Sequence, residues 1–338
     1  MRSFASDNNS GVHPRILEAI LDANQNHAIG YGDDKWTKQA KDAFRQLIGL
    51  EDVEPYFVFN GTGANVIALQ ACARPFNSII CPTTSHIAVD ECGAPTFISG
   101  ALLKEVVTPD GKLTPELVRP QLKGFGVEHH SQPKVIAISQ TTEMGTAYSP
   151  EELRALADLA HEHNMYLFVD GTRVANACAH FGVSLKEMMV DTGVDIFTFG
   201  GTKNGLMIGE AIVPLRPELE EYMKFIRKQT TQLASKMRYV SAQFVPYWGE
   251  GIWLKNAQWS NAKAQELADA MRKADIELTQ PVESNAIFFR MEKERVDQLL
   301  EHYFFYDWDA AADEYRLVCS WDTTDEDIEQ FIAHLKKL

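Results

Sequence analysis

DIFTFGGTKNG, residues 195–205, joins an apolar run to a turn rich in glycine. The run from Ile196 to Phe199 predicts a short buried strand, and the glycines after it predict a tight loop. Lys203 therefore stands at the mouth of a strand, in backbone that glycine lets fold closely. An amine half-shielded from water there is expected to have a lowered pKa, which makes it a nucleophile able to form a Schiff base. Taken alone, a loop lysine is more simply read as a solvated side chain.

Strands and helices are predicted to alternate upstream of this stretch, from about residue 55 to residue 200. Short apolar runs alternate there with segments of helical periodicity. The predicted strands cover residues 56–59, 78–81, 104–108, 134–140, 165–169 and 196–199. This order is typical of an α/β domain, in which helices cover both faces of a mostly parallel sheet.

The pattern changes after the lysine loop. EAIVP at 210–214 predicts a returning strand, and a mostly helical region follows to about residue 273, with a break near 246–251. Further strands are predicted at 276–278, 286–290 and 315–319, with helices at 293–302 and 324–337. We therefore expect an N-terminal arm and a large domain over residues 1–248 and a small α+β domain over residues 249–338. The polar arm itself, residues 3–13, is expected to be disordered or to dock as a lid.

Residues of functional type follow the predicted strands. They are His86, Thr142, Asp170, Arg173 and Lys203. Ligands of open α/β sheets bind at the carboxyl ends of the strands, so we expect these side chains to meet at one edge. Any one of them alone would more simply be structural, and the prediction rests on their convergence.

NGTGAN, residues 60–65, opens a helix directly after the strand at 56–59. The free N–H groups at such a helix start bind anions, and Gly61 and Thr62 could cradle a phosphate. The motif is not GxGxxG, so a single phosphate fits it better than the pyrophosphate of a dinucleotide. An ordinary strand–turn–helix is the simpler reading of this segment alone.

These features together match the needs of pyridoxal 5'-phosphate. Its aldehyde needs a lysine, its ring nitrogen a carboxylate and its phosphate a set of backbone donors. Lys203, Asp170 and the glycine-rich helix start supply them, and His86 is a candidate to stack on the ring. Arg173 and Arg316 are candidates to bind the carboxylate of an amino-acid substrate. For each arginine alone, a surface ion pair is the simpler reading.

Nine blocks of the chain resemble the threonine aldolases, a family of fold-type I pyridoxal phosphate enzymes related in fold to aspartate aminotransferase. The blocks are FASDNNSG, YGDD, FNGTGAN, SHI with DECGAP, SQTTEMG, VDGTRVANA, FGGTKNG, QLASKMR and RLVCSWDT, and they follow the order of the family. Several look most like the low-specificity L-threonine aldolase branch, which also contains phenylserine aldolases. The resemblance covers nearly the whole chain.

The resemblance implies a role for each matching residue at the cofactor. It makes Lys203 the Schiff-base lysine, Asp170 the partner of the pyridine nitrogen and His86 the stacking histidine. It makes Gly61 and Thr62 ligands of the phosphate.

The resemblance also implies a substrate site and a shared interface. Arg173 would lie against the cofactor and the substrate carboxylate, and Ser6 and Arg316 would complete the carboxylate site. Arg238 would help at the phosphate, and Tyr31 would line the site, each across a subunit interface in a tetramer built from dimers.

Two blocks depart from the family: the usual aspartate–glycine–alanine–arginine is aspartate–glycine–threonine–arginine at residues 170–173, and the other departure concerns the general base. Many members have asparagine–threonine–histidine where this chain has Gln140, Thr141 and Thr142. The histidine is often proposed to handle the substrate hydroxyl, so the general base here is left to His86, Glu143 or an ordered water.

The implied activity is retro-aldol cleavage of L-threonine, L-allo-threonine or related β-hydroxy-α-amino acids to glycine and an aldehyde. A phenylserine aldolase or a β-eliminating lyase on the same scaffold is the alternative, and a non-catalytic metabolite-binding protein is a third reading that no residue favours.

Composition narrows the partners. The chain has 338 residues and a net charge of −15, which argues against nucleic acid or an anionic membrane as partner. Its five cysteines lack CxxC spacing, and no signal peptide or membrane span is apparent, so we expect reduced thiols in the cytoplasm. The histidine pair at 129–130 lacks further ligands at suitable spacing, so no metal site is expected.

Overall fold

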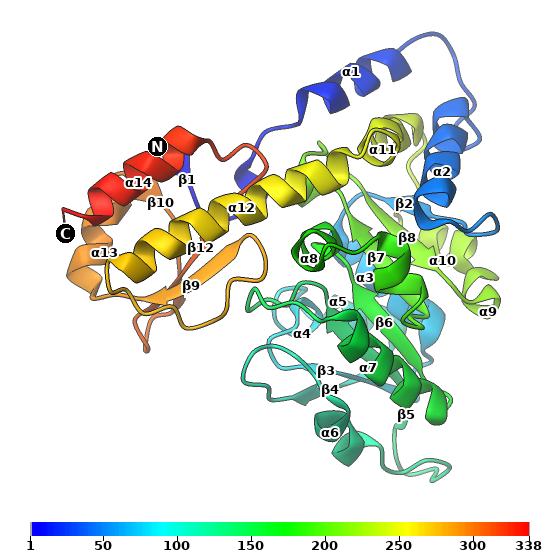
Figure 1. Ribbon diagram of the computed structural model, residues 1–338. Helices are drawn as coiled ribbons and strands as arrows, with labels where there is room; N and C mark the ends of the chain where they lie inside the picture. Colours follow the sequence, from blue (N-terminus) through cyan, green and yellow to red (C-terminus); the bar gives the residue numbers. More distant parts are fainter. Residues whose placement is uncertain (1, 338) are drawn as a thin grey trace.

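The computed structural model describes residues 2–337. A larger part is built on a seven-stranded sheet, a smaller part lies near the C-terminus, and the long helix α12 runs from one to the other (Figure 1). The strands are β1 Arg2–Ser3, β2 Tyr56–Val58, β3 Asn77–Pro82, β4 Leu102–Val106, β5 Gln132–Ser139, β6 Tyr166–Asp170, β7 Ile196–Gly200, β8 Glu210–Pro214, β9 Ala286–Arg290, β10 Tyr303–Phe304, β11 Tyr306–Asp309 and β12 Glu314–Val318.

Helices alternate with the strands through the larger part. The α-helices are α1 Pro14–Ala23, α2 Lys35–Ile48, α3 Gly61–Cys72, α4 His86–Val89, α5 Ala94–Ser99, α6 Pro115–Val118, α7 Pro150–Glu162, α8 Val174–Phe181, α9 Pro217–Glu220, α10 Met223–Gln229, α11 Arg238–Gly249, α12 Ile252–Lys273, α13 Lys293–Leu300 and α14 Asp325–Leu335. Single turns of other helix types are η1 Asp7–Asn9, η2 Arg119–Gln121, η3 Lys186–Val190 and η4 Thr202–Asn204. Each helix within residues 2–337 is too short or too polar to span a lipid bilayer.

The large sheet has the strand order β2-β8-β7-β6-β5-β3-β4. The pairs that join β7, β6, β5, β3 and β4 are all parallel, and β8 alone runs antiparallel to its neighbours β7 and β2. The prediction of a mostly parallel α/β sheet is therefore confirmed. Every residue of β7 is buried, which explains why the strand before the lysine loop reads as a continuous apolar run.

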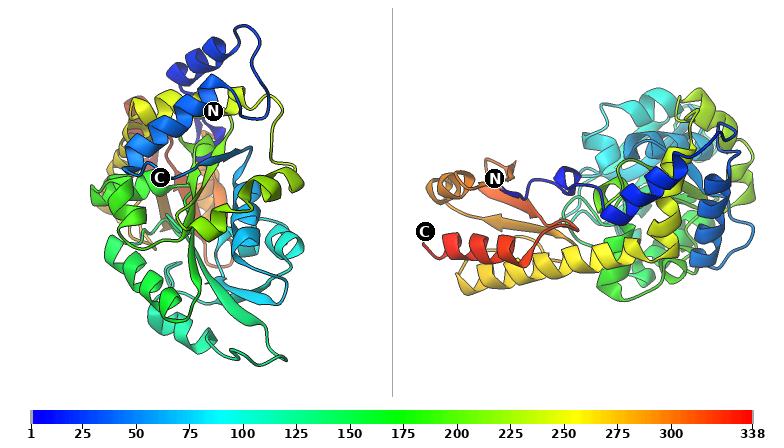
Figure 2. Two further views of the ribbon diagram at one scale, coloured as in Figure 1. Left: turned by 90° about the vertical axis from the view of Figure 1, so that its right-hand side faces the viewer. Right: turned by 90° about the horizontal axis from the view of Figure 1, so that it is seen from above.

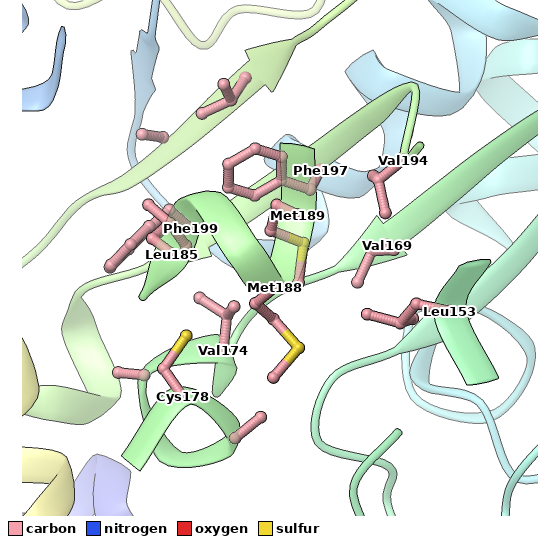
Figure 3. Packing of buried hydrophobic residues seen from close by; sticks show 14 of the residues in the cluster. Leu153, Val169, Val174, Cys178, Leu185, Met188, Met189, Val194, Phe197 and Phe199 are labelled. Atoms are coloured by element: carbon pink, nitrogen blue, oxygen red, sulfur yellow. The ribbon is translucent and has the colours of Figure 1, made fainter. Parts of the chain in front are cut away.

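Each face of the sheet carries its own apolar cluster, because successive side chains of a strand point to opposite faces. Val169 and Phe197 belong to the cluster under α7, α8 and η3, whereas their neighbours Phe168 and Ile196 belong to the cluster under α3. Figure 3 shows the first cluster, in which the β6 and β7 side chains pack on Met188 and neighbouring residues of η3 and α8. Because helices cover both faces of the sheet, a ligand-binding site is expected at the ends of the strands.

Helix α12 belongs to both parts of the molecule. Trp253, near its start, packs in the cluster of the large sheet, and Leu267 packs in a separate cluster with the small sheet β11-β12-β9. The view from above in Figure 2 shows α12 along one side of both parts, with α14 beside its C-terminal half. The small α+β unit expected at the C-terminus is present.

The N-terminal arm is ordered by the small unit. Its strand β1 pairs with β10, and Phe4 is buried with its ring edge-on to Phe331 at 5.4 Å and to Tyr303 at 5.8 Å. Beyond Phe4 the chain makes the turn η1 over the large sheet's edge. Of the two alternatives for the arm, disorder is wrong: a two-strand pairing and one buried ring hold it in place.

One local prediction differs from the structure. Residues 276–278 form no strand; Leu278 makes a single antiparallel bridge to Phe289, and Pro281 follows, which lacks the donor a longer ladder needs. The helix break predicted near residues 246–251 is confirmed, since α11 continues through Pro246, ends at Gly249 and is followed by α12 from Ile252. The break falls at Gly251, whose φ of +71° a glycine adopts without strain.

Candidate active site

A cavity of about 230 Å³ opens at the carboxyl edge of the large sheet. Its walls come from the loops after β2, β3, β6 and β7, from the start of β8 and from η1. The lining residues are Asn8, Phe59, Asn60, Gly61, Thr62, Asn65, His86, Thr172, Thr202, Lys203 and Glu210. The expected convergence of strand ends is present, although the cavity includes residues that the sequence had not singled out.

Two glycines let the loops after β6 and β7 approach each other closely. A Cβ on Gly171 would lie 1.9 Å from the carbonyl oxygen of Thr198, and a Cβ on Gly200 would lie 2.0 Å from that of Thr172. Real Cβ atoms do not approach backbone this closely, so any side chain at either position would push the loops apart. This contact sets the spacing between the Asp170 turn and the Lys203 turn.

Lys203 lies on the turn η4, and its half-buried side chain lines the cavity. Its neighbour Asn204 anchors the turn from beneath by donating to the Tyr247 hydroxyl and to the carbonyl of Trp253, both at 2.8 Å. Tyr247 in turn donates to the carbonyl of Gly200 at 3.0 Å. Lys203 makes no ion pair within residues 2–337, so its amine is available to the cavity.

The start of α3 presents free backbone donors to the cavity. The side chain of Asn60 caps the helix by accepting from the N–H of Gly63 at 2.7 Å. The N–H groups of Gly61 and Thr62 precede the first intrahelical bond and line the cavity. Twelve residues of helix stand behind them, so their positive end favours a bound phosphate.

Asp170, at the end of β6, is buried and held by neutral donors. Its Oδ1 accepts from the N–H of Thr172 at 3.0 Å and from that residue's hydroxyl at 2.7 Å, and its Oδ2 accepts from Nδ2 of Asn65 at 2.9 Å. Within residues 2–337 the carboxylate has no cationic partner. A buried carboxylate so arranged suits a cationic ring nitrogen.

His86 lines the cavity from the first residue of α4. Its Nδ1 lies 2.8 Å from Oε1 of Glu91, whose side chain is fully buried. The hydrogen bond to Glu91 raises the pKa of His86, burial opposes this effect, and the charges of Glu143 and Asp170 raise the pKa further. Glu143 itself is half-buried and forms no hydrogen bond within the described part of the chain, and its charge acts on His86.

The side chain of Arg173 forms an ion pair with Asp7 of the same chain. Its Nε and Nη2 donate to the two carboxylate oxygens of Asp7 on η1, both at 2.8 Å. Burial raises the pKa of Asp7, but the charge and the hydrogen bonds of Arg173 outweigh burial and hold that pKa below its ordinary value. Ser6 caps the same turn by accepting from the N–H of Asn8 at 3.2 Å. The pair fastens the arm over the site.

Arg316 differs because it has no carboxylate partner within residues 2–337. It lies on β12, its Nε is buried without a hydrogen bond, and its Nη2 reaches only the carbonyl of Ala5, at 3.4 Å. Its guanidinium lies 5.0 Å from the ring centre of Trp308. Burial and the neighbouring charge of Arg173 lower the pKa of Arg316. A half-buried guanidinium that has no carboxylate partner within residues 2–337 is suited to bind an anion.

Two residues assigned by resemblance lie away from the cavity of their own chain. The side chain of Tyr31 is 53% exposed, with the Lys228 ammonium 5.1 Å from its ring centre. Arg238 donates to the carbonyl of Asn26 at 3.1 Å and lies over the ring of Tyr239. A role for either at the site stays a prediction that requires a second subunit.

The position that departs from the family pattern does not offer a replacement base. The hydroxyl of Thr142 lies 2.7 Å from that of Thr146, which donates to the carbonyl of Asp110 at the same distance. Both threonines are buried, so they hold the loop together.

Among residues 2–337, no three His, Cys, Asp or Glu side chains gather as a candidate metal site.

Glu210 is a buried acid on the cavity wall that sequence reasoning missed. It starts β8, and its Oε2 accepts from the N–H of Gly201 at 2.7 Å. Burial raises the pKa of Glu210 to about 7, although hydrogen bonds from Thr202 and Gly201 and the charge of Lys203 act in the opposite direction. The carboxyl therefore sits beneath the lysine turn and changes its charge near neutral pH.

We expect Glu210→Gln to remove part of the pH dependence of stability of the cofactor-free protein. The folded state holds this proton up to about pH 7, whereas the unfolded chain releases it near the ordinary value of 4.5. Stability is therefore lost as pH rises through this window, by up to about 3 kcal/mol. Thermal unfolding at pH 5 and pH 8 should show a larger loss for the wild type than for the variant.

The exposed Glu221→Gln change is the matched control and should follow the wild type. Equal pH dependence in wild type and Glu210→Gln would contradict the buried-acid assignment.

The sequence did carry signals for some residues that were missed. Asn65 is a polar amide inside α3, whose residues from Gly63 to Leu69 are all buried. Glu91 sits in an acidic run, DECGAP, that was used only as a family block. Asp7 was treated as part of a polar arm, and nothing local marks it as the partner of Arg173.

Comparisons with known proteins agree with the geometry. The chain matches the β-eliminating lyase family over residues 3–294. It is 39% identical to the low specificity L-threonine aldolase of Pseudomonas aeruginosa, over 99% of this chain and 97% of that protein. The structure of a threonine aldolase from Leishmania major aligns with a TM-score of 0.95 at 30% identity, covering 100% of this chain and 99% of that one.

A more distant likeness shows the fold alone. An aspartate aminotransferase of Thermus thermophilus aligns with a TM-score of 0.70 at 16% identity, covering 99% of this chain and 90% of that one. The fold-type I architecture expected from the sequence is therefore confirmed.

Proposed function

Because the chain belongs to the β-eliminating lyase family and, within it, to the threonine aldolases, we propose that it cleaves L-threonine and L-allo-threonine to glycine and acetaldehyde with pyridoxal 5'-phosphate. The single observation that supports this proposal most directly is the shared cavity of Lys203, His86 and the α3 start, with Asp170 behind it.

The residues present fit pyridoxal 5'-phosphate. Lys203 supplies a free amine for its aldehyde carbon, and Asp170 supplies a buried carboxylate without a cationic partner for its ring nitrogen. The N–H groups of Gly61 and Thr62 supply donors for its phosphate, and His86 lines the wall where a flat ring would lie. When bound, the cofactor provides an electron sink for the pair of electrons released when a bond at Cα breaks.

Arg316 is the residue that would bind the carboxylate of the substrate. A guanidinium binds a carboxylate through two parallel hydrogen bonds, and Arg316 has donors to spare because only one weak bond engages it. Arg173 supports this site indirectly, since its own fork is occupied by Asp7. Fixing the carboxylate orients the substituents at Cα, and this orientation selects the bond that breaks.

Cleavage also requires a group that accepts the proton of the substrate's β-hydroxyl. His86, which lines the cavity, and Glu143, whose charge acts on His86, are the candidate side chains, and an ordered water is a third acceptor. Thr142 is unsuited because its hydroxyl is committed to Thr146.

A phenylserine aldolase is the second candidate for the same site, and β-elimination is a third. Both use the same lysine, aspartate and arginine, so they differ from the first proposal only in substrate and in the bond broken. A non-catalytic metabolite-binding protein is the least supported reading, because it gives no reason for a free lysine amine beside a partnerless buried carboxylate.

Product detection tests the proposal. Purified protein with pyridoxal phosphate is given L-threonine, L-allo-threonine, L-phenylserine and L-serine separately, and glycine is followed with the aldehyde or keto acid. We expect glycine and acetaldehyde from at least one threonine isomer. Keto acid without glycine would favour β-elimination, benzaldehyde alone would favour phenylserine cleavage, and no product from any substrate would refute the lyase assignment.

The assembly and its location are further proposals. A homotetramer, arranged as a dimer of dimers, would place Tyr31 and Arg238 of one subunit near the cavity of another, and their position outside their own cavity supports it. All five cysteines are free thiols, and this supports a reducing cytoplasm as the place of work.

A further inference from the structure

We propose that Glu91 and Asn65 are positioning residues that join His86 and Asp170 into one hydrogen-bonded unit, in which Glu91 orients the imidazole for proton exchange with the substrate at Nε2. The proposal deepens the aldolase assignment and depends on it for the identity of the substrate. Its physical basis, the state of His86, is independent of that assignment and can be measured without any substrate.

The unit is a continuous chain of short contacts. Oε1 of Glu91 accepts from Nδ2 of Asn65 at 2.7 Å and lies 2.8 Å from Nδ1 of His86. The same Nδ2 donates to Oδ2 of Asp170 at 2.9 Å. An amide nitrogen carries two hydrogens, and here each is directed to a different carboxylate. Asn65 thus links Asp170 to Glu91, the carboxylate that contacts His86.

The contact with Glu91 fixes which nitrogen of His86 faces the cavity. An ionised carboxylate can only accept, so Nδ1 carries the hydrogen of the Glu91 contact. Nε2 lies on the other side of the ring and makes no hydrogen bond to any residue in 2–337, while His86 lines the cavity. A carboxylate behind a histidine sets the tautomer and raises the basicity of the free nitrogen.

The charges around His86 act in the same direction. The pKa of His86 is raised by Glu91 on the turn after α4, by Glu143 on the loop after β5 and by Asp170 at the end of β6. From α3 the facing side chain is the neutral Asn65, and Lys203 is the cation on the same cavity. Burial is the opposing effect.

The burial of Glu91 argues against a merely structural role. Its side chain is fully buried, yet among residues 2–337 its Oε2 has no hydrogen-bond partner, and the buried amide oxygen of Asn65 has none there either. Buried polar atoms without a hydrogen-bond partner destabilise a fold. A loop that needed only a stable turn would be more stable with an apolar side chain at either position, so these groups are better explained by what they do to His86 and Asp170.

The test is the titration of His86 in the cofactor-free protein. Deuterated protein labelled with carbon-13 at histidine Cε1 is titrated by NMR, and the His86 signal is identified by its loss in His86→Asn. We expect Glu91→Gln to lower the pKa of His86 by about one unit or more, because the charge behind the ring is removed while a hydrogen-bond acceptor remains. Glu187→Gln, an exposed acid that caps another turn, is the matched control.

Enzyme kinetics supply the second readout. We expect the acidic limb of the kcat/KM profile for threonine to move down by the same amount as the His86 pKa in Glu91→Gln, and Glu91→Asp to restore part of the shift. If Glu91→Gln does not fold, Glu91→Asp and Asn65→Asp are titrated instead, and an altered His86 pKa is again expected.

An unchanged His86 pKa in folded Glu91 variants would overturn the proposal, as would a shifted pKa with an unmoved rate profile. A protein that cleaves none of the four amino acids would refute the aldolase assignment instead, and the NMR titration would still decide whether Glu91 orients His86.

Discussion

Lys203→Ala is expected to lower the rate of threonine cleavage by about a thousandfold or more, because it removes the amine that we propose binds the cofactor covalently. The same variant is expected to hold pyridoxal phosphate only by non-covalent contacts. After borohydride reduction, the wild type should carry the added mass on the peptide containing Lys203, and the variant should carry none. Kinetics and mass spectrometry thus measure the role in two independent ways.

The structure explains why no other lysine should substitute. Lys203 is the lysine that lines the cavity, and its turn is held from below by Asn204, Tyr247 and Trp253. The turn should therefore keep its shape when the side chain is shortened. A loss of activity would then result from the missing amine and not from a changed loop. Lys224→Ala, which removes an exposed amine on α10, is the control and should retain full activity. Rapid cleavage by Lys203→Ala would contradict the assigned role.

Those parts of the fold and the site that depend on neighbouring residues could be predicted from the sequence. The β7 strand and the Lys203 turn follow from one local pattern, an apolar run that ends in glycines. The start of α3 follows from NGTGAN in the same way. A glycine such as Gly171 or Gly200 indicates a loop. The close approach that these two glycines permit could not be predicted, because it involves backbone on the neighbouring strand.

Parts that depend on long-range contacts could not be predicted. Arg173 meets Asp7 across 166 positions of the chain, and Asp7 meets Asn285 across 278. Asn65 and Glu91 acquire a role only because α3, α4 and β6 meet beneath one cavity. No periodicity or spacing encodes such meetings, so a polar arm and an acidic run were all that the sequence offered. The sequence alone does not distinguish Arg173 from Arg316 for the same reason, because the Asp7 partner of Arg173 lies 166 positions away in the chain.

Arg316→Gln is expected to lower kcat/KM for threonine by about a hundredfold to a thousandfold, with most of the loss in KM. The substrate carboxylate would lose a charge-assisted, bidentate contact with a half-buried guanidinium, a change of about 3 kcal/mol. A direct measurement of glycine binding to the cofactor-loaded protein should weaken by a similar factor, because glycine carries the same carboxylate. The structural reason is the guanidinium of Arg316 itself, which is half-buried next to the N-terminal arm and has no carboxylate partner within residues 2–337.

Arg290→Gln is the matched control, since Arg290 lies on the paired strand β9 and binds the exposed Glu277. It should leave both constants unchanged. The rival arrangement gives Arg173 the substrate carboxylate and requires that Asp7 release it. In that case Asp7→Asn would free Arg173 and tighten glycine binding, whereas Arg316→Gln would have little effect. Because the Asp7–Arg173 pair is buried and bonded through both oxygens, releasing it would leave an unpaired charge, at a cost of several kcal/mol. Arg316 involves no such release, so glycine binding should weaken in Arg316→Gln, and in Asp7→Asn it should not tighten.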